Sequence, residues 1–588
     1  MNSSFVRRLS TAPPEYTMPA LVCKTGNLRE KIEFQQQGIA SLKREIFGTD
    51  KKPHSKYIQE FMSEFTDFEA LATYEELLEK ARRSRIVYVG DYHALDKYQQ
   101  FQARLLEDLA DRPVLLAIEM FYGRNQRALD DWMTGRIDDE QLRRRVRYKL
   151  EWGYSWEEYL GVLEVARRNR IPVFCVDCAP RNDLRYIRRR DTAVAAKIAD
   201  ILARHPEQTL VVSFGESHLA DRHLPAKVRR HFPDGGLGSE LTILQNIDEI
   251  YWKLACSGAE DARQVKLSEN VYCVLNATPF EKYEAYRRQL EIWKAQDQED
   301  QQLDLTSTVY NLINTIVDFI RIDRYSYCLT RESACLEFFV DAYPEVYSRD
   351  EFDVFESLLE TSRFTRTQVR DVLNHAMRQG SCYVPRVNAI FVGKFSLVHG
   401  AEEAAHFVNF ALKRQRYQNY RPEPLEPADE FYLSVLEEAL GYFGSKLIDP
   451  RRNHLVESPV LGSGGLDRAT RRLLGVTSRQ LAWMRRFVVA HKKMELDYGR
   501  MRKVPGVITD GVSSRGRTFT ILTHELGYLL GEQLYRGYLD GALSRREISR
   551  LFRVRFEDEG RPLAAYLDLA ERAGRLEAVG AAAEAAAR

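Results

Sequence analysis

Residues 85–93 read RIVYVGDYH, and this stretch indicates the fold class. Its first part, Arg85–Val89, is a short apolar and β-branched run that is typical of a buried strand. Three similar runs follow, at Val114–Ile118, Pro172–Val176 and Thr209–Phe214. Because helical patterns separate these runs, we predict an α/β fold with a mainly parallel sheet flanked by helices on both faces.

The segments around these strands extend the same pattern. Further strands are expected at Glu240–Gln245 and Val271–Leu275. Thr73 with Glu76 forms a capping-box signal for a helix that precedes the first strand. The other expected helices are 27–47, Lys97–Leu109, Asn125–Trp132, Asp139–Lys149, Trp156–Asn169 and Thr192–Arg204.

The chain is too long for one compact core, since it has 588 residues and cores stop growing near ~250–300. Residues 294–304 (KAQDQEDQQLD) are almost wholly polar and are interpreted as a linker. We expect an N-terminal helical extension at 1–69, an α/β domain at 70–293 and a mostly α-helical domain at 305–588. The helices expected in the last part are 305–321, 331–342, 350–360, 366–378, 401–415, 429–446, 477–498, 517–540, 544–552 and 561–573, and Cys382–Val398 is expected to form a hairpin.

Composition excludes several classes of protein. The formal charge is +1, from 86 basic and 85 acidic residues, which argues against a nucleic-acid partner. No window of about 18 apolar residues suggests a membrane span. Cys23 loosely resembles a lipoprotein site, but the N-terminus lacks the apolar core of a signal peptide. We therefore expect a cytoplasmic protein, in which eight cysteines do not form a disulfide framework.

Polar residues of the kinds that bind metals or transfer protons follow the four predicted strands. They are Gly90-Asp91-Tyr92-His93, Glu119, Asp177 and Gly215-Glu216-Ser217-His218. Ligands of open parallel sheets bind beyond the carboxyl ends of the strands. Two of the four ends repeat the pattern Gly-x-x-His, so we predict one shared site there.

Histidine with carboxylate suits a divalent metal ion such as Fe, Mn or Zn. The predicted ligands are His93, Glu119 and His218, with Asp177 as a further carboxylate. Such a metal would acidify bound water, and Asp91 or Glu216 could then act as a catalytic base. A lone histidine after a strand is more often a capping residue, and the repetition of the motif is what favours a site.

Four longer segments in this order resemble the ChaN family, which comprises haem- or iron-associated bacterial proteins of the wider Tiki, TraB and erythromycin-esterase superfamily. The segments are 86–109 (IVYVGDYHALDKYQQFQARLLEDL), 114–138 (VLLAIEMFYGRNQRALDDWMTGRID), 152–177 (WGYSWEEYLGVLEVARRNRIPVFCVD) and 211–228 (VVSFGESHLADRHLPAKV). The resemblance covers roughly residues 70–285.

The resemblance implies two kinds of function. ChaN-like proteins are similar to haem-binding uptake proteins, whereas other members of the superfamily are hydrolases with paired Gly-x-x-His motifs and an acid. Carried onto this chain, the shared positions are His93, Glu119 and His218. The family's first motif usually has Glu where this chain has Asp91, and Asp177 stands where Asn is frequent. The export signal usual in ChaN proteins is also missing.

Haem requires an apolar slot and an axial ligand. The histidines of the two motifs, and Tyr92 and Tyr122 as oxygen ligands, are the candidates.

Two other features are discounted. Cys175-x-x-Cys178 is not expected to be a redox pair because Cys175 falls within a buried strand, and Arg185–Arg190 is interpreted as a solvated helix face.

The C-terminal half resembles no family that we recognise. Thr523–Tyr528 (THELGY) begins like the zinc-peptidase motif HExxH, but Tyr528 replaces the second histidine. Two ligand-type pairs, Glu403 with His406 and His491 with Glu495, have a helical spacing that could build a metal site. Charged helices produce such pairs by chance. Gly527 and Gly531 are expected to let another helix pack closely.

Three functional readings remain open. We favour a ChaN-like haem- or iron-binding protein, whose cofactor is haem or a divalent metal ion. The first alternative is a metal-dependent hydrolase acting on an ester, lactone or peptide. The second is a non-catalytic scaffold whose helical C-terminal half binds a protein partner.

Overall fold

The computed structural model divides the chain into two compact units. The α/β unit comprises Met1–Val22 and Gln36–Gln301, and the helical unit comprises Cys23–Gln35 and Gln302–Arg588. The division at 69/70, 293/294 and 304/305 stays a prediction. The residues that the structure describes are 23–47, 56–181, 186–233, 236–295, 305–323, 339–393, 396–414, 427–461, 475–501, 517–556 and 562–573.

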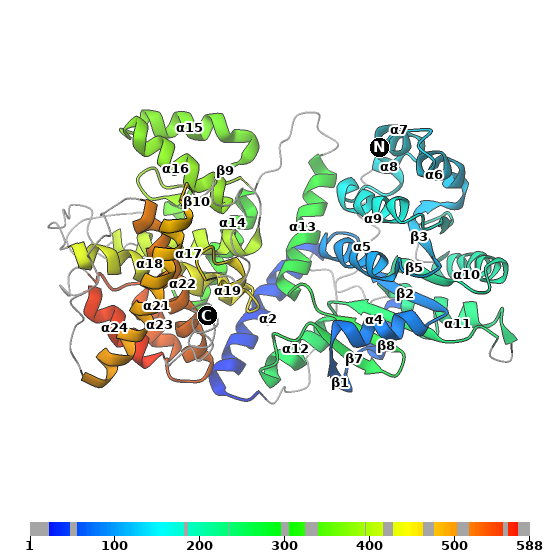
Figure 1. Cartoon of the computed structure of the whole chain (residues 1–588), viewed down its shortest axis with the longest axis horizontal. Coiled ribbons are helices and arrows are strands. Elements are labelled where there is room, and N and C mark those ends of the chain that lie inside the picture. The colour runs from blue at the N-terminus through cyan, green and yellow to red at the C-terminus, as the bar shows by residue number, and fades with distance from the viewer. Residues whose placement is uncertain are drawn as a thin grey trace. The chain divides into compact units, whose positions relative to one another are not determined.

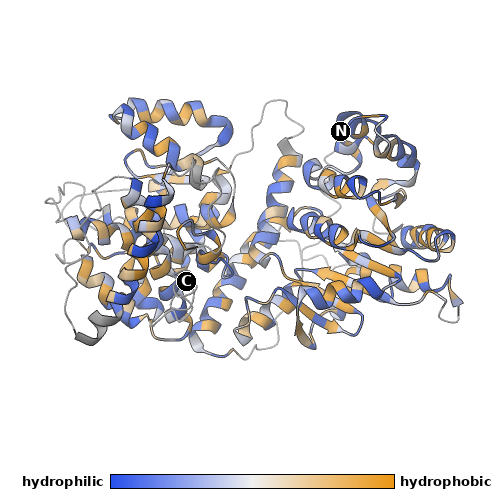
Figure 2. Cartoon of the chain, in the orientation of Figure 1, coloured by the Kyte–Doolittle hydropathy of each residue, from blue (hydrophilic) through white to orange (hydrophobic). Residues whose placement is uncertain are grey.

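The α/β unit is built on an eight-stranded sheet with the order β1-β7-β8-β6-β2-β5-β3-β4. All neighbours from β8 to β4 pair in parallel, as predicted, and β7 pairs antiparallel with both β1 and β8. The strands are mostly apolar (orange in Figure 2). Their bounds are β1 Ala70–Ala72, β2 Ile86–Asp91, β3 Val114–Tyr122, β4 Val173–Asp177, β5 Thr209–Gly215, β6 Glu240–Gln245, β7 Gln264–Ser268 and β8 Val271–Val274.

Six of these strands were predicted, and three differ in a way that matters for the site. Strand β3 does not end at Ile118 but continues to Tyr122, so Glu119 lies within a wholly buried strand. A shift in the β3–β4 register between Ile118 and Tyr122 accompanies this extension. Strand β2 likewise includes Asp91, and a third strand, β4, includes Asp177. The polar residues are therefore held by strand backbone, which restrains them more than loops would.

Helices cover both faces of this sheet. In Figure 1, α5 and α9 lie on one side of the strands and α10 lies on the other. The capping box of Thr73 and Glu76 is present at the start of α4. The helices of this unit are α3 Lys56–Glu64, α4 Tyr74–Arg83, α5 Lys97–Leu109, α6 Gln126–Met133, α7 Asp139–Arg145, α8 Tyr148–Glu151, α9 Trp156–Arg168, α10 Ile187–Arg204, α11 Leu224–Arg229, α12 Asp248–Ser257 and α13 Pro279–Ala295, and α2 Gly26–Phe47 contributes its second half.

Two predicted helices have different bounds in the structure. The helix expected at Asp139–Lys149 is divided, because Arg147 between α7 and α8 adopts a left-handed conformation with φ 53°. The helix expected from Thr192 begins at Ile187 instead. This earlier start places Arg190 inside a helix that packs on the sheet.

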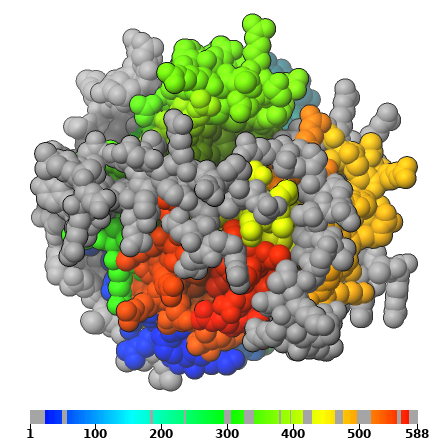
Figure 3. Space-filling view, turned by 90° about the vertical axis from the view of Figure 1, so that its left-hand side faces the viewer, coloured from blue at the N-terminus to red at the C-terminus, as the bar shows by residue number. Residues whose placement is uncertain are grey.

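The helical unit carries a small three-stranded sheet, ordered β10-β11-β9. β10 and β11 form the predicted antiparallel hairpin, and β9 pairs in parallel with β11. Figure 3 shows α15 and α16 (green) at one end of this unit. Its elements are α14 Thr306–Phe319, β9 Glu345–Ser348, α15 Phe352–Thr361, α16 Arg366–Gln379, β10 Ser381–Val384, β11 Ala389–Val392, α17 Leu397–Arg414, α18 Pro427–Ile448, α19 His454–Glu457, α21 Ser478–Met501, α22 Arg517–Leu539, α23 Arg545–Leu551 and α24 Pro562–Arg572. Of the predicted helix 331–342, residues 339–342 form a 3-10 turn and 331–338 lie outside the described residues.

Glycines set the distance between the central helices α17, α18 and α22. A Cβ on Gly444 of α18 would lie 2.4 Å from the Cβ of Ala405 on α17. A Cβ on Gly527 of α22 would lie 2.3 Å from the Cβ of Glu438 on α18. Gly531 is equally constrained, 2.7 Å from the carbonyl oxygen of Ala439. The predicted close packing at Gly527 and Gly531 is confirmed.

Among the described helices, none is long and apolar enough to cross a membrane.

Replacing Leu105 with Ala should destabilise the α/β unit. Leu105 of α5 is fully buried in its core, so the truncation removes apolar burial and leaves a cavity, at a cost of about 2–5 kcal/mol in the free energy of unfolding. Tryptophan fluorescence during urea unfolding measures this, because of the six tryptophans only Trp483 lies in the helical unit. Leu150→Ala is the control: Leu150 is 49% exposed, and a change above about 0.5 kcal/mol there would contradict the assigned core.

Candidate functional site

The carboxyl ends of β2, β5, β3 and β4 lie side by side in the sheet. This order brings three of the predicted ligands around one backbone position. A Cβ added to Gly215 would lie 3.2 Å from Glu119 Oε2, 3.4 Å from His93 Nε2 and 3.5 Å from His218 Cδ2. Gly215 therefore allows His93, Glu119 and His218 to converge, since a larger residue would push them apart.

His93 is oriented by the end of its own strand. It adopts φ 68°, and its backbone N–H donates to Asp91 Oδ1 at 2.8 Å. Its Nδ1 lies 3.1 Å from Asp91 Oδ2, and its Nε2 lies 3.8 Å from Glu119 Oε2. Burial lowers the pKa of His93, but the carboxylates of Asp91 and Glu119 outweigh burial and raise it overall. Asp91 is itself held by the Tyr159 hydroxyl, which donates at 2.6 Å.

His218 is held by a carboxylate that the sequence analysis missed. Its Nδ1 lies 2.5 Å from Asp191 Oδ1 of α10 and 3.0 Å from the hydroxyl of Tyr57 on α3. Tyr57 also donates to Asp191 Oδ2 at 2.8 Å. The imidazole is 4% exposed, so His218 is part of a buried hydrogen-bonded network and not an open strand-end side chain.

Arg190 lies between three of the four predicted metal ligands. Its Nε donates to Asp177 Oδ1 at 2.6 Å, its Nη2 donates to Glu119 Oε1, and its Nη1 lies 3.3 Å from His218 Nε2. The prediction that Arg185–Arg190 forms a solvated face is wrong for Arg190, which is 6% exposed. Its neighbour Arg188 is half exposed and pairs with Glu60.

The guanidinium controls the ionisation of Glu119. Burial alone raises the pKa of this carboxyl, but the positive charge of Arg190, followed by His93 and His218, lowers it to about 2. Glu119 is further held by the backbone N–H of Gly215, which donates to Oε2 at 2.5 Å. Glu119 is thus a permanently charged, fully paired carboxylate near neutral pH.

A second arginine, Arg181, extends the network to the aromatic side chains. Its Nε donates to Asp177 Oδ2 at 2.8 Å, and its Nη2 donates to the carbonyl oxygen of Glu119 at 2.8 Å. The guanidinium lies 4.3 Å from the ring centre of Tyr122 and 4.5 Å from that of Trp152. Trp152 in turn packs edge-on against His93, with ring centres 4.6 Å apart.

Two other predicted residues, Glu216 and Tyr92, contact Lys282 of α13. Glu216 Oε1 lies 3.4 Å from Lys282 Nζ, and burial raises its pKa although Lys282 opposes this. Tyr92 is buried against the same ammonium, 4.7 Å from its ring centre, and burial raises its pKa well above the usual value. Glu216 and Tyr92 are thus held by Lys282 and not by Arg190.

Tyr122 borders a groove of about 670 Å³ along the outermost strand β4. Burial raises the pKa of Tyr122, partly offset by Arg181. Cys178 lines the groove and is partly exposed, whereas Cys175 is buried and its pKa is raised by burial. Apolar lining comes from Met133, Val173, Phe174 and Ile201, and basic lining from Arg124, Lys197 and Arg204.

The predicted ligand set has its negative charge balanced by arginine. Glu119 and Asp177 both accept from Arg190, and Asp177 also accepts from Arg181. A metal ion bound by Glu119, Asp177 and His218 would have to displace this guanidinium. The groove beside Tyr122 offers a different donor set, a phenol and a thiol among apolar side chains, with Arg124, Lys197 and Arg204 and the aspartates Asp130, Asp177 and Asp200 around them. A phenol or thiol beside apolar surface is the kind of donor set that fits haem.

Comparison with known proteins supports the resemblance seen in the sequence. Residues 77–190 match the family model described as haem-binding uptake, Tiki superfamily, ChaN. This match includes His93, Glu119, Asp177 and Arg190, and ends before His218. The chain is thus similar to ChaN-type haem-binding proteins over part of the α/β unit.

Two solved structures are also similar to part of the chain. The type III effector HopBA1 is 16% identical, with 31% of this chain and 87% of that chain covered and a TM-score of 0.24. ChaN of Campylobacter jejuni, described with cofacial haem binding, is 13% identical, with 32% and 94% covered and a TM-score of 0.25. The search of curated proteins found no match.

Replacing Arg190 with Met should leave Glu119 and Asp177 as buried carboxylates without their main partner. At pH 7 this costs about 3–5 kcal/mol in the free energy of unfolding, measured by tryptophan fluorescence in urea. In the wild type the folded pKa of Glu119, about 2, lies below its ordinary 4.5. Its stabilising contribution is therefore present above pH 4.5 and is lost as the pH falls toward 2. The free energies of unfolding of the wild type and the variant should therefore become more similar below pH 4.

The matched control is Arg188→Met on the same helix. Arg188 is half exposed, so the loss of its surface ion pair costs at most about 1 kcal/mol at any pH. Equal destabilisation by the two substitutions would show that Arg190 is not a buried charge partner of Glu119.

Proposed function

We propose that the α/β unit binds haem in the groove beside Tyr122. The observation that carries this proposal is the match of residues 77–190 to a haem-binding family model, together with a groove at Tyr122 whose lining suits a porphyrin. Pockets of about 300–1,000 Å³ are typical for cofactors, and the groove has about 670 Å³. The expected cytoplasmic location and an iron-handling role remain parts of this proposal.

The groove supplies the kinds of group that a haem needs. Tyr122 has a phenolic oxygen of the type that ligates haem iron, and Cys178 has a thiol that is a second candidate ligand. Met133, Val173, Phe174 and Ile201 provide apolar surface for the ring. Bound haem would supply an iron centre able to change oxidation state.

Basic side chains around the groove match the two propionates of haem. Arg124 packs its guanidinium 4.4 Å from the ring centre of Tyr122. Lys197 and Arg204 project from α10 along the same groove. Lys197 Nζ donates to the carbonyl oxygens of Val176 and Asp177, each at 2.9 Å. Arg124 pairs with Glu151 and Arg204 pairs with Asp200. Both arginines are more than half exposed, and surface ion pairs of this kind contribute little stability, so we assign propionate binding to these two arginines in exchange for their present partners.

In this proposal the predicted residues around Gly215 act on the groove through Arg181. Arg181 connects the two places, because it contacts Asp177 and Tyr122 together. Arg181 would lower the energy of a phenolate at Tyr122 by its positive charge. His93 and His218 would then be positioning residues and not axial ligands.

Metal-dependent hydrolysis is the second candidate. The observation that favours it is the pairing of each histidine with its own aspartate, His93 with Asp91 and His218 with Asp191. Such a pairing orients an imidazole for proton transfer or metal binding. Arg190 argues against it, because its guanidinium already neutralises Glu119 and Asp177. Ester hydrolysis that needs added Mn or Zn and is lost in His93→Ala would favour this candidate.

Titration of the full chain with ferric haem tests the proposal. The wild type should give a shifted Soret band that saturates near one haem per chain, with a phenolate-to-iron charge-transfer band. Tyr122→Phe should lose the charge-transfer band and bind roughly tenfold or more weakly, because it removes the iron ligand and leaves the apolar groove.

Tyr74→Phe is the control for this titration. Tyr74 hydrogen-bonds Asp108 at 2.7 Å and does not line the groove, so its variant should titrate like the wild type. Identical spectra and affinities for Tyr122→Phe and the wild type would remove Tyr122 as ligand. A wild type with no saturable Soret change would remove the haem function itself.

A further inference from the structure

We propose that the helical unit holds a divalent transition-metal ion between Glu402 and His406 of α17, Glu438 of α18 and His524 of α22. This site is separate from the haem groove of the α/β unit and does not depend on it. The combination of imidazole and carboxylate ligands is that of Zn, Mn and non-haem Fe(II) proteins.

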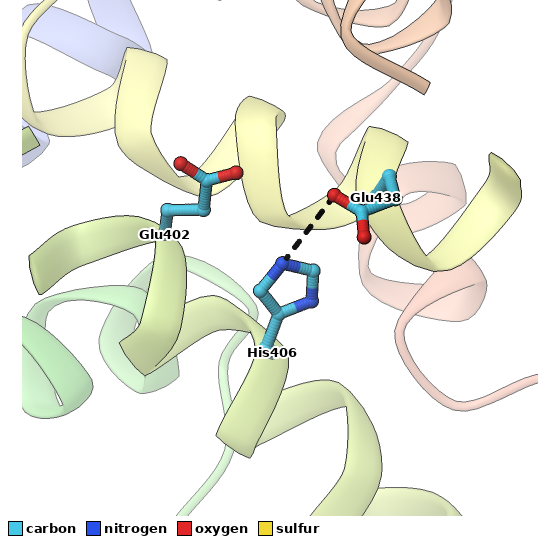
Figure 4. Close-up of side chains that lie close together, drawn as sticks. All are labelled: Glu402, His406 and Glu438. Carbon is cyan, nitrogen blue, oxygen red and sulfur yellow. Dashed lines mark ion pairs between the residues drawn. The ribbon is translucent and has the colours of Figure 1, made fainter. Parts of the chain in front are cut away.

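The side chains already lie at the distances that such a site needs. Ligand atoms of Glu402, His406 and Glu438 all lie within 4.8 Å of one another, and no other such group of three was found among the described residues. Figure 4 shows Glu402 and His406 projecting from successive turns of α17, with Glu438 facing them from α18. His406 Nε2 lies 4.0 Å from Glu438 Oε2.

His524 completes the set from a third helix. Its Nδ1 lies 2.9 Å from Glu438 Oε2, the same oxygen that faces His406. Its ligand atoms are not within 4.8 Å of all three other residues, so His524 would join a metal ion at about 2.0–2.2 Å from nitrogen and oxygen through the place it shares with Glu438. The predicted pair Glu403 with His406 is not the one formed, because Glu403 instead accepts from Ser381 and from the backbone of Tyr383.

Glycines at the helix contacts keep this place clear. A Cβ on Gly441 of α18 would lie 2.5 Å from Nε2 of His406. Gly527 of α22 comes one turn after His524 and would place a Cβ 2.3 Å from the Cβ of Glu438. Side chains at either position would displace a proposed ligand, so the helix packing and the ligand cluster depend on the same two glycines.

The cluster opens onto space for water or a small molecule. A cavity of about 170 Å³ is lined by all four proposed ligands. It shares His375, His399, His524 and Tyr528 with an adjoining cavity of about 1380 Å³ in the same unit. Four protein ligands leave positions for exogenous ligands on a metal that accepts five or six, and a substrate could reach them through the larger cavity.

Neighbouring side chains hold Glu402 in place. The Tyr528 hydroxyl donates to Oε1 at 2.5 Å, and Arg452 Nη1 forms a buried ion pair with Oε2 at 2.9 Å. Arg452 also pairs with Glu457, so its one charge is shared between two carboxylates, and Glu438 has no arginine partner among the ion pairs of the described residues. Tyr528 also packs on His524, with ring centres 3.9 Å apart. Hydrogen bonds of this kind orient the ligands of metal sites. Tyr528, which rules out the zinc-peptidase motif, therefore acts here as a positioning residue.

Cobalt(II) binding to the full chain tests this site without interference from haem iron. After treatment with a chelator, the wild type should bind about one Co(II) with visible d–d bands, and Zn(II) should displace it. The double variant His406→Ala/His524→Ala should bind Co(II) at least roughly 100-fold more weakly, because it lacks two of the four proposed ligands. His231→Ala, at an exposed histidine of the α/β unit, should bind like the wild type.

Glu438→Gln keeps the size of the side chain. It is the second test of the site if the double variant loses its helical circular dichroism and so fails to fold. It should weaken Co(II) binding while the dichroism stays unchanged. A wild type that binds no Co(II) would overturn the proposal. So would equal binding by the wild type and either ligand variant.

Discussion

The α/β unit depends on one buried cation. Arg190 lies where the ends of β3, β4 and β5 meet, and its guanidinium contacts Glu119, Asp177 and His218. Two carboxylates this deeply buried would be strongly unfavourable without a partner. Helix α10 therefore packs with Arg190 against the carboxyl ends of these strands.

The pairing of acids with bases also distinguishes two regions of the unit, the residues around Gly215 and the groove beside Tyr122. Around Gly215 the acids and bases are already paired with one another, His93 with Asp91, His218 with Asp191 and Glu119 with Arg190. Along β4, a groove next to Tyr122 remains accessible. Arg181 contacts both regions, so the paired network can influence a ligand in the groove through one guanidinium. This arrangement favours haem in the groove over a metal ion at Gly215.

Much of the fold followed from periodicity, and the exceptions have physical reasons. Apolar runs identified six strands of the sheet. Strand β1 is apolar but only three residues long, and β7 (QVKLS) has one buried residue, so neither forms an apolar run long enough to predict a strand. The convergence of His93, Glu119 and His218 followed from topology alone. Arg190 and Asp191 could not be found this way, because an arginine-rich helix start looks solvated until the sheet edge beneath it is known. In the helical unit, Glu402 and Glu403 are adjacent, and only the helix packing shows which of them faces His406.

In the proposed function Tyr122, in the groove, and not a histidine at Gly215, is the haem ligand. Resonance Raman spectroscopy of the ferric haem complex of the unmodified full chain tests this directly, because vibrations of an iron-bound phenolate differ from those of an iron-bound imidazole. We expect phenolate modes from Tyr122. A spectrum with histidine as the iron ligand and no phenolate modes would overturn this assignment.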